Sequence, residues 1–170
     1  KISKNKEILV KGKSLMQGYW KDQHSTKNTI INGWLHTGDI GLIDNENYLK
    51  ILGRKNEMIV NSGGENISPT PIEEIILSYD EIEQVMVYGH QRPYLVALIL
   101  PSPEIGKNKE LMQMILNKIN LKLSIPKKIR KFYLLNEPFT TQNSQLTPTL
   151  KIKRRVIEKN YFKELNNLYH

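Results

Sequence analysis

Two polar turns of the sequence hold side chains with binding chemistry. In GWLHTGDIG (residues 33–41), Gly38 permits a tight turn that exposes the carboxylate of Asp39. A carboxylate has two acceptor oxygens and can therefore hold a vicinal diol such as a ribose. Turns that contain Gly and Asp are common, so an ordinary Asp turn is the favoured interpretation of this stretch when it is taken alone.

The second turn lies in LGRKNEMIVNSGGENISP (residues 52–69), which is polar and rich in glycine. Arg54 presents a fork of donors that could grip a phosphate or a carboxylate. Gly63 and Gly64 allow the backbone to approach a ligand closely or to adopt a positive φ. Taken alone, a double glycine is more often only a turn.

A lysine in QLTPTLKIKRR (residues 145–155) has three interpretations. Lys151 follows a stiff Thr-Pro-Thr turn, and three more cations stand at residues 153–155. Lys151 could be a single positioned charge that reaches one phosphate. The run could instead be a solvated helix N-terminus, although the helix dipole disfavours cations there. A basic patch for nucleic acid would need interleaved aromatic or base-reading side chains, and none occur between Pro148 and Arg155.

Other chemistries lack support in the sequence. The four histidines, His24, His36, His90 and His170, are scattered without metal-ligand spacing, and the chain contains no cysteine. No Ser–His–Asp set is visible. We therefore expect no metal site and no acyl-enzyme chemistry.

The net charge of +8 is unevenly distributed. Residues 1–53 carry eight basic and five acidic side chains, residues 54–117 carry five and nine, and residues 118–170 carry twelve and three. The last segment, with a net charge of +9, points to an anionic partner, either a polymer or a small phosphorylated molecule. The longest apolar run, YLVALIL, is far shorter than the roughly 18 residues of a membrane span. We expect a cytoplasmic protein.

The N-terminal part of the chain is predicted to be β-rich. EILVKG (residues 7–12) alternates weakly and predicts a strand, and SLMQGYW (residues 14–20) predicts a bend. IGLID and YLKILG, separated by NEN, predict a hairpin. After Gly53 the sequence becomes polar and rich in glycine, so we expect domains at residues 1–53 and 54–170.

The second part predicts a compact α+β unit. TPIEEIILSY predicts a helix with Thr70 as the N-cap, Pro71 at the first position and Glu73 closing a capping box. After the short strand MIV and this helix, we expect two strands, QVMVYG and YLVALIL, a helix over residues 107–123, a strand KFYLL, and a helix from Lys153. The predicted core stripes of the last two helices are Leu111, Ile115, Ile119 and Leu123, and Ile157, Tyr161, Leu165 and Leu168.

The order of these blocks is more specific than any one of them. GYW, GWLHTGDIG, GRKNEMIVNSGGENISPTPIEEI and LTPTLKIKRR together resemble the last third of the adenylate-forming acyl-CoA synthetases, the AMP-binding ligase superfamily. RPYLVALILP, KIRKFYLLNEPFT and LTPTLKIKRR resemble most closely the bacterial-type long-chain fatty acid–CoA ligases. The resemblance implies a β-rich end of the large domain, followed by a mobile domain with a three-stranded sheet, a short β-hairpin and flanking helices.

The resemblance also implies a reaction in two halves. A fatty acid carboxylate attacks the α-phosphate of ATP, and the thiol of CoA then displaces AMP from the acyl-adenylate. ATP would be bound with Mg²⁺, mainly by residues upstream of this chain, and CoA is the co-substrate. By family position, Asp39 binds the ribose hydroxyls, Arg54 contacts the nucleotide near its ribose and phosphate, and Asn56 is the hinge.

Two further sites follow from the resemblance. Gly63, Gly64 and Glu65 fall in the loop that lines the pantetheine tunnel, and Lys151 falls on the catalytic lysine that bridges the α-phosphate and the acyl carboxylate. The family usually has Asp or Lys at the position of Asn56, and usually has Gly at the position of Leu150. The phosphate loop and the adenine and acyl pockets of the family lie outside this sequence, so we expect the chain alone to be inactive.

Three other functions stay open at this point. An acyl-AMP ligase that loads a carrier protein uses the same blocks, a basic nucleic-acid-binding module could use the +9 segment, and a stand-alone interaction domain would need no chemistry. The expected partners are ATP, fatty acid, CoA and the remainder of the large domain, with no nucleic acid. Peripheral association with a membrane is left open.

Overall fold

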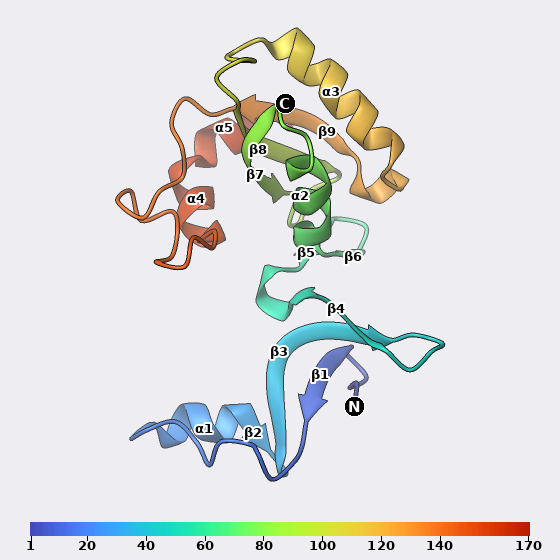
Figure 1. The fold of residues 1–170 in the computed structure, drawn as a ribbon, viewed down its shortest axis with the longest axis vertical. Coiled ribbons are helices and arrows are strands. Elements are labelled where there is room, and N and C mark those ends of the chain that lie inside the picture. Colours follow the sequence, from blue (N-terminus) through green and yellow to red (C-terminus); the bar gives the residue numbers. More distant parts are fainter. The chain divides into compact units, whose positions relative to one another are not determined.

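The computed structural model describes residues 1–170, which form two compact units, unit 1 (Lys1–Met58) and unit 2 (Ile59–His170). Figure 1 colours unit 1 blue to cyan and unit 2 green to red. The units divide between Met58 and Ile59, whereas the boundary expected from the sequence lies between Gly53 and Arg54. None of the helices combines the length and apolar composition that a transmembrane span requires.

Unit 1 is built around one long strand, β3 (Trp34–Ile43). Strands β1 (Glu7–Val10), β2 (Ile30–Ile31) and β4 (Leu49–Arg54) all pair with it in antiparallel fashion. The predicted first strand and the predicted hairpin, now β3–β4, are therefore confirmed. The one-turn helix η1 (Lys55–Glu57) follows β4.

Helix α1 (Gln23–Thr29) was not predicted, because it buries none of its residues and so has no apolar stripe. The Asp22 carboxylate caps the helix by accepting a hydrogen bond from the Ser25 amide at 2.9 Å. A polar helix without such a stripe is invisible to a search for hydrophobic periodicity.

Unit 2 has the predicted α+β architecture. Its sheet has the order β7 (Ile82–Tyr88), β8 (Leu95–Pro101) and β9 (Ile129–Leu134), with β7 antiparallel and β9 parallel to β8. Strands β5 (Ile59–Val60) and β6 (Asn66–Ile67) form the short hairpin. The helices are α2 (Pro69–Leu77), α3 (Lys109–Leu121), η2 (Ile125–Lys127), α4 (Arg154–Asn160) and α5 (Phe162–Asn167).

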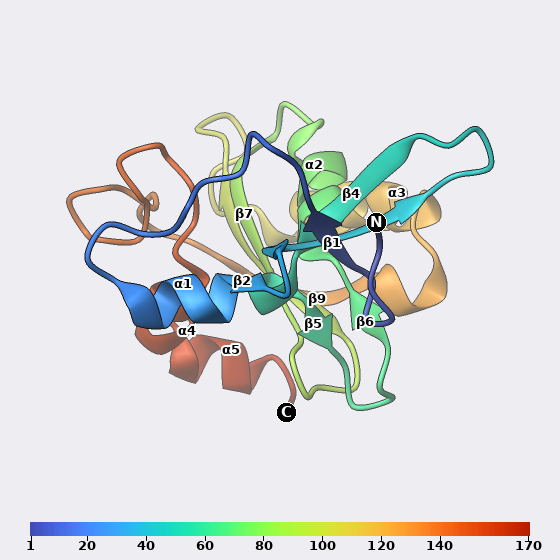
Figure 2. The same cartoon turned by 90° about the horizontal axis from the view of Figure 1, so that it is seen from below.

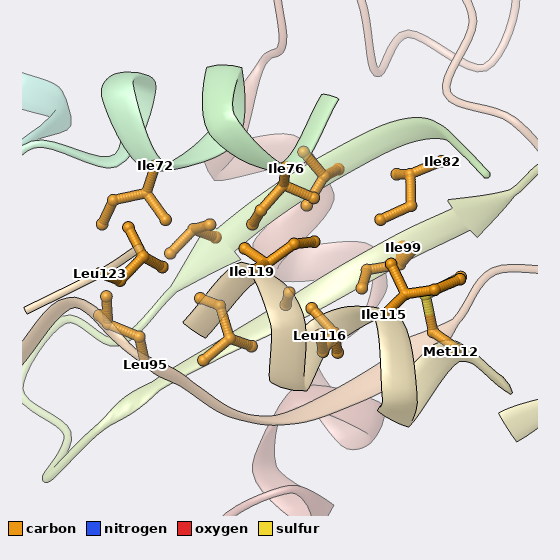
Figure 3. Packing of buried hydrophobic residues seen from close by; sticks show 14 of the residues in the cluster. Ile72, Ile76, Ile82, Leu95, Ile99, Met112, Ile115, Leu116, Ile119 and Leu123 are labelled. Carbon is orange, nitrogen blue, oxygen red and sulfur yellow. The ribbon is translucent and has the colours of Figure 1, made fainter. Parts of the chain in front are cut away.

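The sheet of unit 2 is covered on both faces. Alternate residues of a strand point to opposite faces, so Val85, Ala97 and Ile99 join the core beneath α2 and α3. Met86, Val96 and Leu98 join a second core beneath α4 and α5. Figure 3 shows the first core, and Figures 1 and 2 place α4 and α5 together on the side of the sheet away from α3.

Helix α2 begins earlier than predicted. Ser68 is its N-cap and Pro69 occupies the first position, so the predicted cap at Thr70 is wrong. Glu73 closes no capping box, because its carboxylate is committed elsewhere, as described below. Ile72 and Ile76 of this helix are buried in the core.

The two later helices also differ in detail from the prediction. In α3, Ile115 and Ile119 are buried as predicted, but Met112 is buried in place of Leu111, which is exposed. The predicted single C-terminal helix is two short helices, α4 and α5, that meet at Tyr161. Its stripe still packs against the sheet, with Ile157 and Leu165 buried and Tyr161 and Leu168 partly buried.

A buried ion pair joins the two sides of unit 2. Arg154 donates through Nη2 to Glu73 Oε2 at 2.5 Å and through Nη1 to Oε1 at 2.8 Å. The Val87 amide also donates to Glu73 Oε1 at 2.7 Å, and Arg154 Nη1 lies 3.4 Å from the Val87 carbonyl oxygen. The pair thus connects α2, the outer edge of β7 and the first residue of α4.

We expect Arg154→Ala to lower the free energy of unfolding of unit 2 by about 3 kcal/mol, because it leaves a buried carboxylate without its charge partner. Urea unfolding followed by far-ultraviolet circular dichroism measures this. Trp20 and Trp34 both lie in unit 1, so tryptophan fluorescence is an internal control. The matched variant Arg155→Ala, at an exposed neighbour, should change the free energy by less than about 0.5 kcal/mol. If both variants lowered the free energy of unfolding equally, the Glu73–Arg154 ion pair would not be what stabilises unit 2.

Candidate functional site

Asp39 and Arg54 lie opposite each other on β3 and β4. Arg54 Nε donates to Asp39 Oδ1 at 3.1 Å, and Arg54 Nη1 donates to the Thr37 carbonyl oxygen at 3.1 Å. Both charged side chains are partly exposed, so the pair contributes little to stability but orients the carboxylate. The result is an acceptor and a donor side by side on one surface, which suits a ribose and a phosphate.

The turn before Asp39 is fixed by its neighbours. Gly38 has a φ of +73°, which glycine adopts without strain. The Thr37 hydroxyl donates to the Ile8 carbonyl oxygen at 2.9 Å and accepts from the Asp39 amide at 3.0 Å. The Asp39 carboxylate is therefore presented by a backbone that is anchored to β1.

Glu7 of β1 is a buried carboxylate that supports this turn. Its oxygens accept from the Gly38 amide at 3.1 Å, and they lie 3.3 Å from His36 Nδ1 and 3.4 Å from Lys55 Nζ. Burial raises the pKa of Glu7, but the hydrogen bonds from His36 and Gly38 and the charge of Lys55 outweigh it, so that the pKa lies below its ordinary value of 4.5. Glu7 is thus held ionised beneath the turn.

Asn56 occupies the middle of η1, between the last strand of unit 1 and the first strand of unit 2. Its side chain is exposed, and η1 buries none of its residues. A short exposed turn with few buried contacts is the kind of segment that can absorb a change of backbone angles. The assignment of Asn56 as the hinge stays a prediction.

Gly63, Gly64 and Glu65 form the tip of the β5–β6 hairpin. The Asn61 side chain organises this loop, because its Oδ1 accepts from the amides of Gly63 at 3.0 Å and Glu65 at 2.9 Å. Its Nδ2 donates to the Glu65 carboxylate at 2.8 Å. Gly64 has a φ of +79°, and a Cβ added there would meet no atom within 4 Å. The loop is therefore ordered, and the space above Gly64 is open.

A polar recess of about 290 Å³ lies beside this hairpin. Its lining includes Asn61, Glu65, Tyr94, Lys128 and Arg130. The two cations bring positive charge next to the glycine loop, as phosphate groups would require. Sequence reasoning missed this recess, because its members come from three separate stretches of the chain.

Lys151 lies at the end of a closed turn between β9 and α4. The Leu150 amide donates to the Thr147 carbonyl oxygen at 2.9 Å, and the Thr147 amide donates to the Lys151 carbonyl oxygen at 2.8 Å. The Thr147 hydroxyl accepts from the Lys151 amide at 3.0 Å. The Lys151 side chain itself is exposed. The exposed Lys151 side chain is thus attached to a backbone that hydrogen bonds to Thr147 hold in place.

The basic run that includes Lys151 is not one patch. Arg154 points inward to Glu73, with its side chain only 13% exposed, whereas Lys151, Lys153 and Arg155 are exposed. The Arg154 guanidinium is therefore engaged by Glu73 and does not belong to a group of exposed cations. This outcome favours a separately positioned Lys151 over a continuous nucleic-acid surface.

The structure brings Asp39 and Arg54 into contact and places residues 63–65 in one loop. Lys151 lies in a different part of unit 2, because the loop before α4 and the β5–β6 hairpin are separate in both Figure 1 and Figure 2. No cluster of three or more His, Asp or Glu side chains in the chain is arranged to hold a metal ion.

Comparison with known families identifies the C-terminal two thirds of the chain. A family model described as the AMP-binding enzyme C-terminal domain matches residues 56–170. Among curated proteins, the long-chain-fatty-acid–CoA ligase FadD15 of Mycobacterium tuberculosis is 31% identical, with 100% of this chain and 32% of that protein covered. Fatty acyl-CoA synthetase B of Dictyostelium discoideum is 34% identical, with 96% and 28% covered. The chain thus spans about a third of the length of the curated relatives it matches.

Solved structures agree with these relatives. The adenylation domain of a carboxylate reductase from Mycobacterium chelonae superposes with a TM-score of 0.87 at 26% identity, covering 96% of this chain and 27% of that chain. O-succinylbenzoate coenzyme A synthetase from Bacillus subtilis, in complex with AMP, superposes with a TM-score of 0.69 at 28% identity, covering 88% and 29%.

Leu150 has a φ of +59°, a left-handed conformation that is costly for a residue with a Cβ. Its side chain is 72% exposed, so little packing is lost on truncation. We expect Leu150→Gly to raise the free energy of unfolding of unit 2 by about 0.5 kcal/mol, since relief of strain exceeds the added chain entropy. Leu150→Val should lower it, because β-branched residues tolerate positive φ worst. Urea unfolding measures the free energy of unfolding of both variants. Changes of the same sign would show that the backbone at Leu150 is not strained.

Proposed function

The chain belongs to the family of AMP-binding enzyme C-terminal domains, and from this premise we propose that it serves as the C-terminal part of a long-chain fatty acid–CoA ligase. The relative from Mycobacterium tuberculosis is named a long-chain-fatty-acid–CoA ligase, and the relative from Dictyostelium is named a fatty acyl-CoA synthetase. The observation that carries the proposal is the exposed Lys151 on a closed turn, in a chain that also pairs Asp39 with Arg54. The substrates are then ATP, a fatty acid and CoA.

The proposed reaction has two steps. In the first, a carboxylate oxygen of the fatty acid attacks the α-phosphorus of ATP, and the bond to pyrophosphate breaks. In the second, the sulfur of CoA attacks the acyl carbonyl carbon, and the bond to AMP breaks. Mg²⁺ would accompany ATP, and these 170 residues contain no group of three or more His, Asp or Glu side chains placed to hold it.

Asp39 and Arg54 bind the nucleotide in this proposal. The Asp39 carboxylate accepts hydrogen bonds from the ribose hydroxyls. Arg54 orients that carboxylate, and the Arg54 guanidinium also contacts the nucleotide near its phosphate. The anchored turn at Thr37 and Gly38 fixes the position of the acceptor before the nucleotide arrives. Such preorganisation reduces the entropy that binding costs.

Lys151 acts in the first step. Two anions, the carboxylate and the α-phosphate, must approach each other, and a cation between them lowers their repulsion as charge builds on the phosphate oxygens. The Lys151 side chain is exposed, and the hydrogen bonds of its backbone to Thr147 limit where its ammonium can reach. We assign Lys151 as the catalytic residue.

Gly63, Gly64 and Glu65 act in the second step. The open space above Gly64 leaves room for the narrow pantetheine arm to pass the backbone. Lys128 and Arg130 in the adjacent recess supply cations for the phosphate groups of CoA. Because the glycine loop and Lys151 lie in different parts of unit 2, a rotation about the hinge at Asn56 would exchange them at one active centre.

A second candidate is an acyl-AMP ligase that passes the acyl group to a carrier protein. The similarity to the adenylation domains of carboxylate reductases favours it, because one such structure includes a carrier domain and superposes with a TM-score of 0.86. Thioester formation by the full-length enzyme with free CoA supports the CoA ligase, and a requirement for a carrier protein supports the alternative.

A nucleic-acid-binding module that uses the +9 segment is a weaker candidate. Arg154 of that segment is internal and paired with Glu73, so it is not available to bind a phosphate backbone.

The partners in this proposal are the remainder of the large AMP-binding domain and a membrane surface. A long acyl chain partitions into bilayers, since each buried CH₂ contributes about 0.8 kcal/mol. A cytoplasmic enzyme that contacts membranes peripherally would meet this substrate where it is concentrated.

In the full-length ligase, Lys151→Ala should lower the rate of acyl-adenylate formation by about 100- to 1,000-fold. It should largely spare thioester formation from supplied acyl-adenylate. Gly64→Leu should do the reverse, because a large side chain blocks the open space at the loop and strains a positive φ. Pyrophosphate release measures the first step and acyl-CoA formation the second. Equal loss of both steps in either variant would contradict the division of roles.

The 170-residue chain alone should form no acyl-CoA, because it covers about a third of the relatives and offers only part of a nucleotide site. Incubation with ATP, Mg²⁺, palmitate and CoA, followed by measurement of AMP and pyrophosphate, is the test. Turnover that Lys151→Ala removes would refute this expectation.

A further inference from the structure

Helix α3 carries apolar side chains on two sides. Its inner side packs against the sheet, as Figure 3 shows for Met112, Ile115, Leu116 and Ile119. On its outer side, Leu111, Met114 and Leu121 follow at spacings of three and seven residues, which places them on one face of a helix with 3.6 residues per turn. Met114 is 59% and Leu121 84% exposed. Leu111 is 36% exposed, and none of the three belongs to the buried core.

A further exposed aliphatic side chain follows the helix. Ile125, the first residue of η2, is 73% exposed, and it also lines the recess beside the β5–β6 hairpin. Leu121 and Ile125 are thus two exposed aliphatic side chains four residues apart in the sequence, at the end of α3 and the start of η2. Exposed apolar side chains in a row are the mark of an interaction surface.

Positive charge predominates along this stripe. Residues 110–136 contain one acidic side chain, Glu110 in the first turn of α3, and six cations, which are Lys118, Lys122, Lys127, Lys128, Arg130 and Lys131. Lys118 stands between Met114 and Leu121 on the outer side of α3, and Lys127 is exposed in η2. The Lys122 ammonium lies over the Tyr79 ring, 4.8 Å from its centroid.

We propose that this surface, formed by Leu111, Met114, Lys118, Leu121, Ile125 and Lys127 and named here the α3–η2 surface, binds the interface of an anionic lipid bilayer. Aliphatic side chains that enter the boundary between headgroups and acyl chains, with lysines beside them, are how amphipathic helices lie on membranes. Each lysine near an anionic leaflet strengthens binding by about fivefold. The long lysine stems allow the ammonium groups to remain among the headgroups.

The composition favours lipid over a protein or a nucleic acid. The cores of protein interfaces are poor in lysine and rich in Trp, Tyr and Arg, whereas this surface has lysines and aliphatic side chains and no aromatic ring. Proteins that hold single-stranded nucleic acids stack the bases on aromatic side chains, which the α3–η2 surface lacks. The combination of charge and flexible aliphatic groups matches a bilayer.

The inference rests on the proposed function, because a fatty acid substrate explains why the protein would bind a membrane. The test of membrane binding is nevertheless separate from the test of ligase activity. The α3–η2 surface contains none of Asp39, Arg54, Gly63, Gly64, Glu65, Lys128, Arg130 and Lys151, and only its Ile125 also lines the recess assigned to CoA. Vesicle binding by the 170-residue chain needs neither ATP nor turnover, so it can fail while the ligase assignment stands, and the reverse also holds.

The test is cosedimentation of the chain with phosphatidylcholine vesicles that contain about 30 mol% phosphatidylglycerol, compared with phosphatidylcholine alone. We expect binding to the anionic vesicles that weakens as salt rises from about 0.1 to 0.5 M. Leu121→Ser with Ile125→Ser should lower the partition coefficient by at least about tenfold. Lys118→Gln with Lys127→Gln should lower it by a similar factor.

A matched control is available elsewhere on unit 2. Phe162 is 63% exposed in α5 and is flanked by the exposed Lys159 and Lys163. The combined variant Phe162→Ser, Lys159→Gln and Lys163→Gln should leave vesicle binding within about twofold, with circular dichroism confirming that all variants are folded.

Four results would overturn the proposal. They are absence of binding to anionic vesicles, equal binding to neutral vesicles, equal loss in the control variant, and full retention of binding in both α3–η2 variants. Tighter binding to a single-stranded oligonucleotide than to vesicles, lost in the lysine variant, would assign the surface to nucleic acid instead.

Discussion

Strand β8 is the constraint around which unit 2 is organised. Residues Leu95–Ile99 are completely buried, so both faces of this central strand must be covered by other elements. Helices α2 and α3 cover one face, and the chain must then return to the other face to place α4 and α5 there. The loop that makes this return carries Lys151. The position of Lys151, the lysine proposed as catalytic, is therefore a consequence of how a three-stranded sheet excludes water from two faces.

Much of this architecture could be predicted from the sequence, because strong local signals agree with the tertiary fold. The run YLVALIL could only be a strand buried on both faces or a buried helix, and its length favoured the strand. The start of α2 could not be chosen locally, since SPTP contains two cap-and-proline pairs. Tertiary contact decides it: Glu73 bonds to Arg154 and the Val87 amide instead of capping its own helix.

The candidate site divides in the same way. Asp39, Arg54, residues 63–65 and Lys151 could be located because each lies in a contiguous block. The groups that support them come from distant positions, as with the Glu7 carboxylate and the Gly38 amide, 31 residues apart, or Glu73 and Arg154, 81 residues apart. Spacing along a single sequence carries no signal of such pairs. Leu150 is an intermediate case, since the departure from glycine was visible but its left-handed φ was not.

The Glu73–Arg154 pair has one more effect, which concerns the solubility of unit 2. Strand β7 lies at an edge of its sheet, where unpaired amides and carbonyls invite strands of other molecules to add on. The Glu73 carboxylate accepts a hydrogen bond from the Val87 amide, and the Arg154 guanidinium lies near the Val87 carbonyl oxygen. The backbone of the strand edge at Val87 therefore already has hydrogen-bond partners. Unit 2 is thereby protected at this point against edge-to-edge pairing with copies of itself.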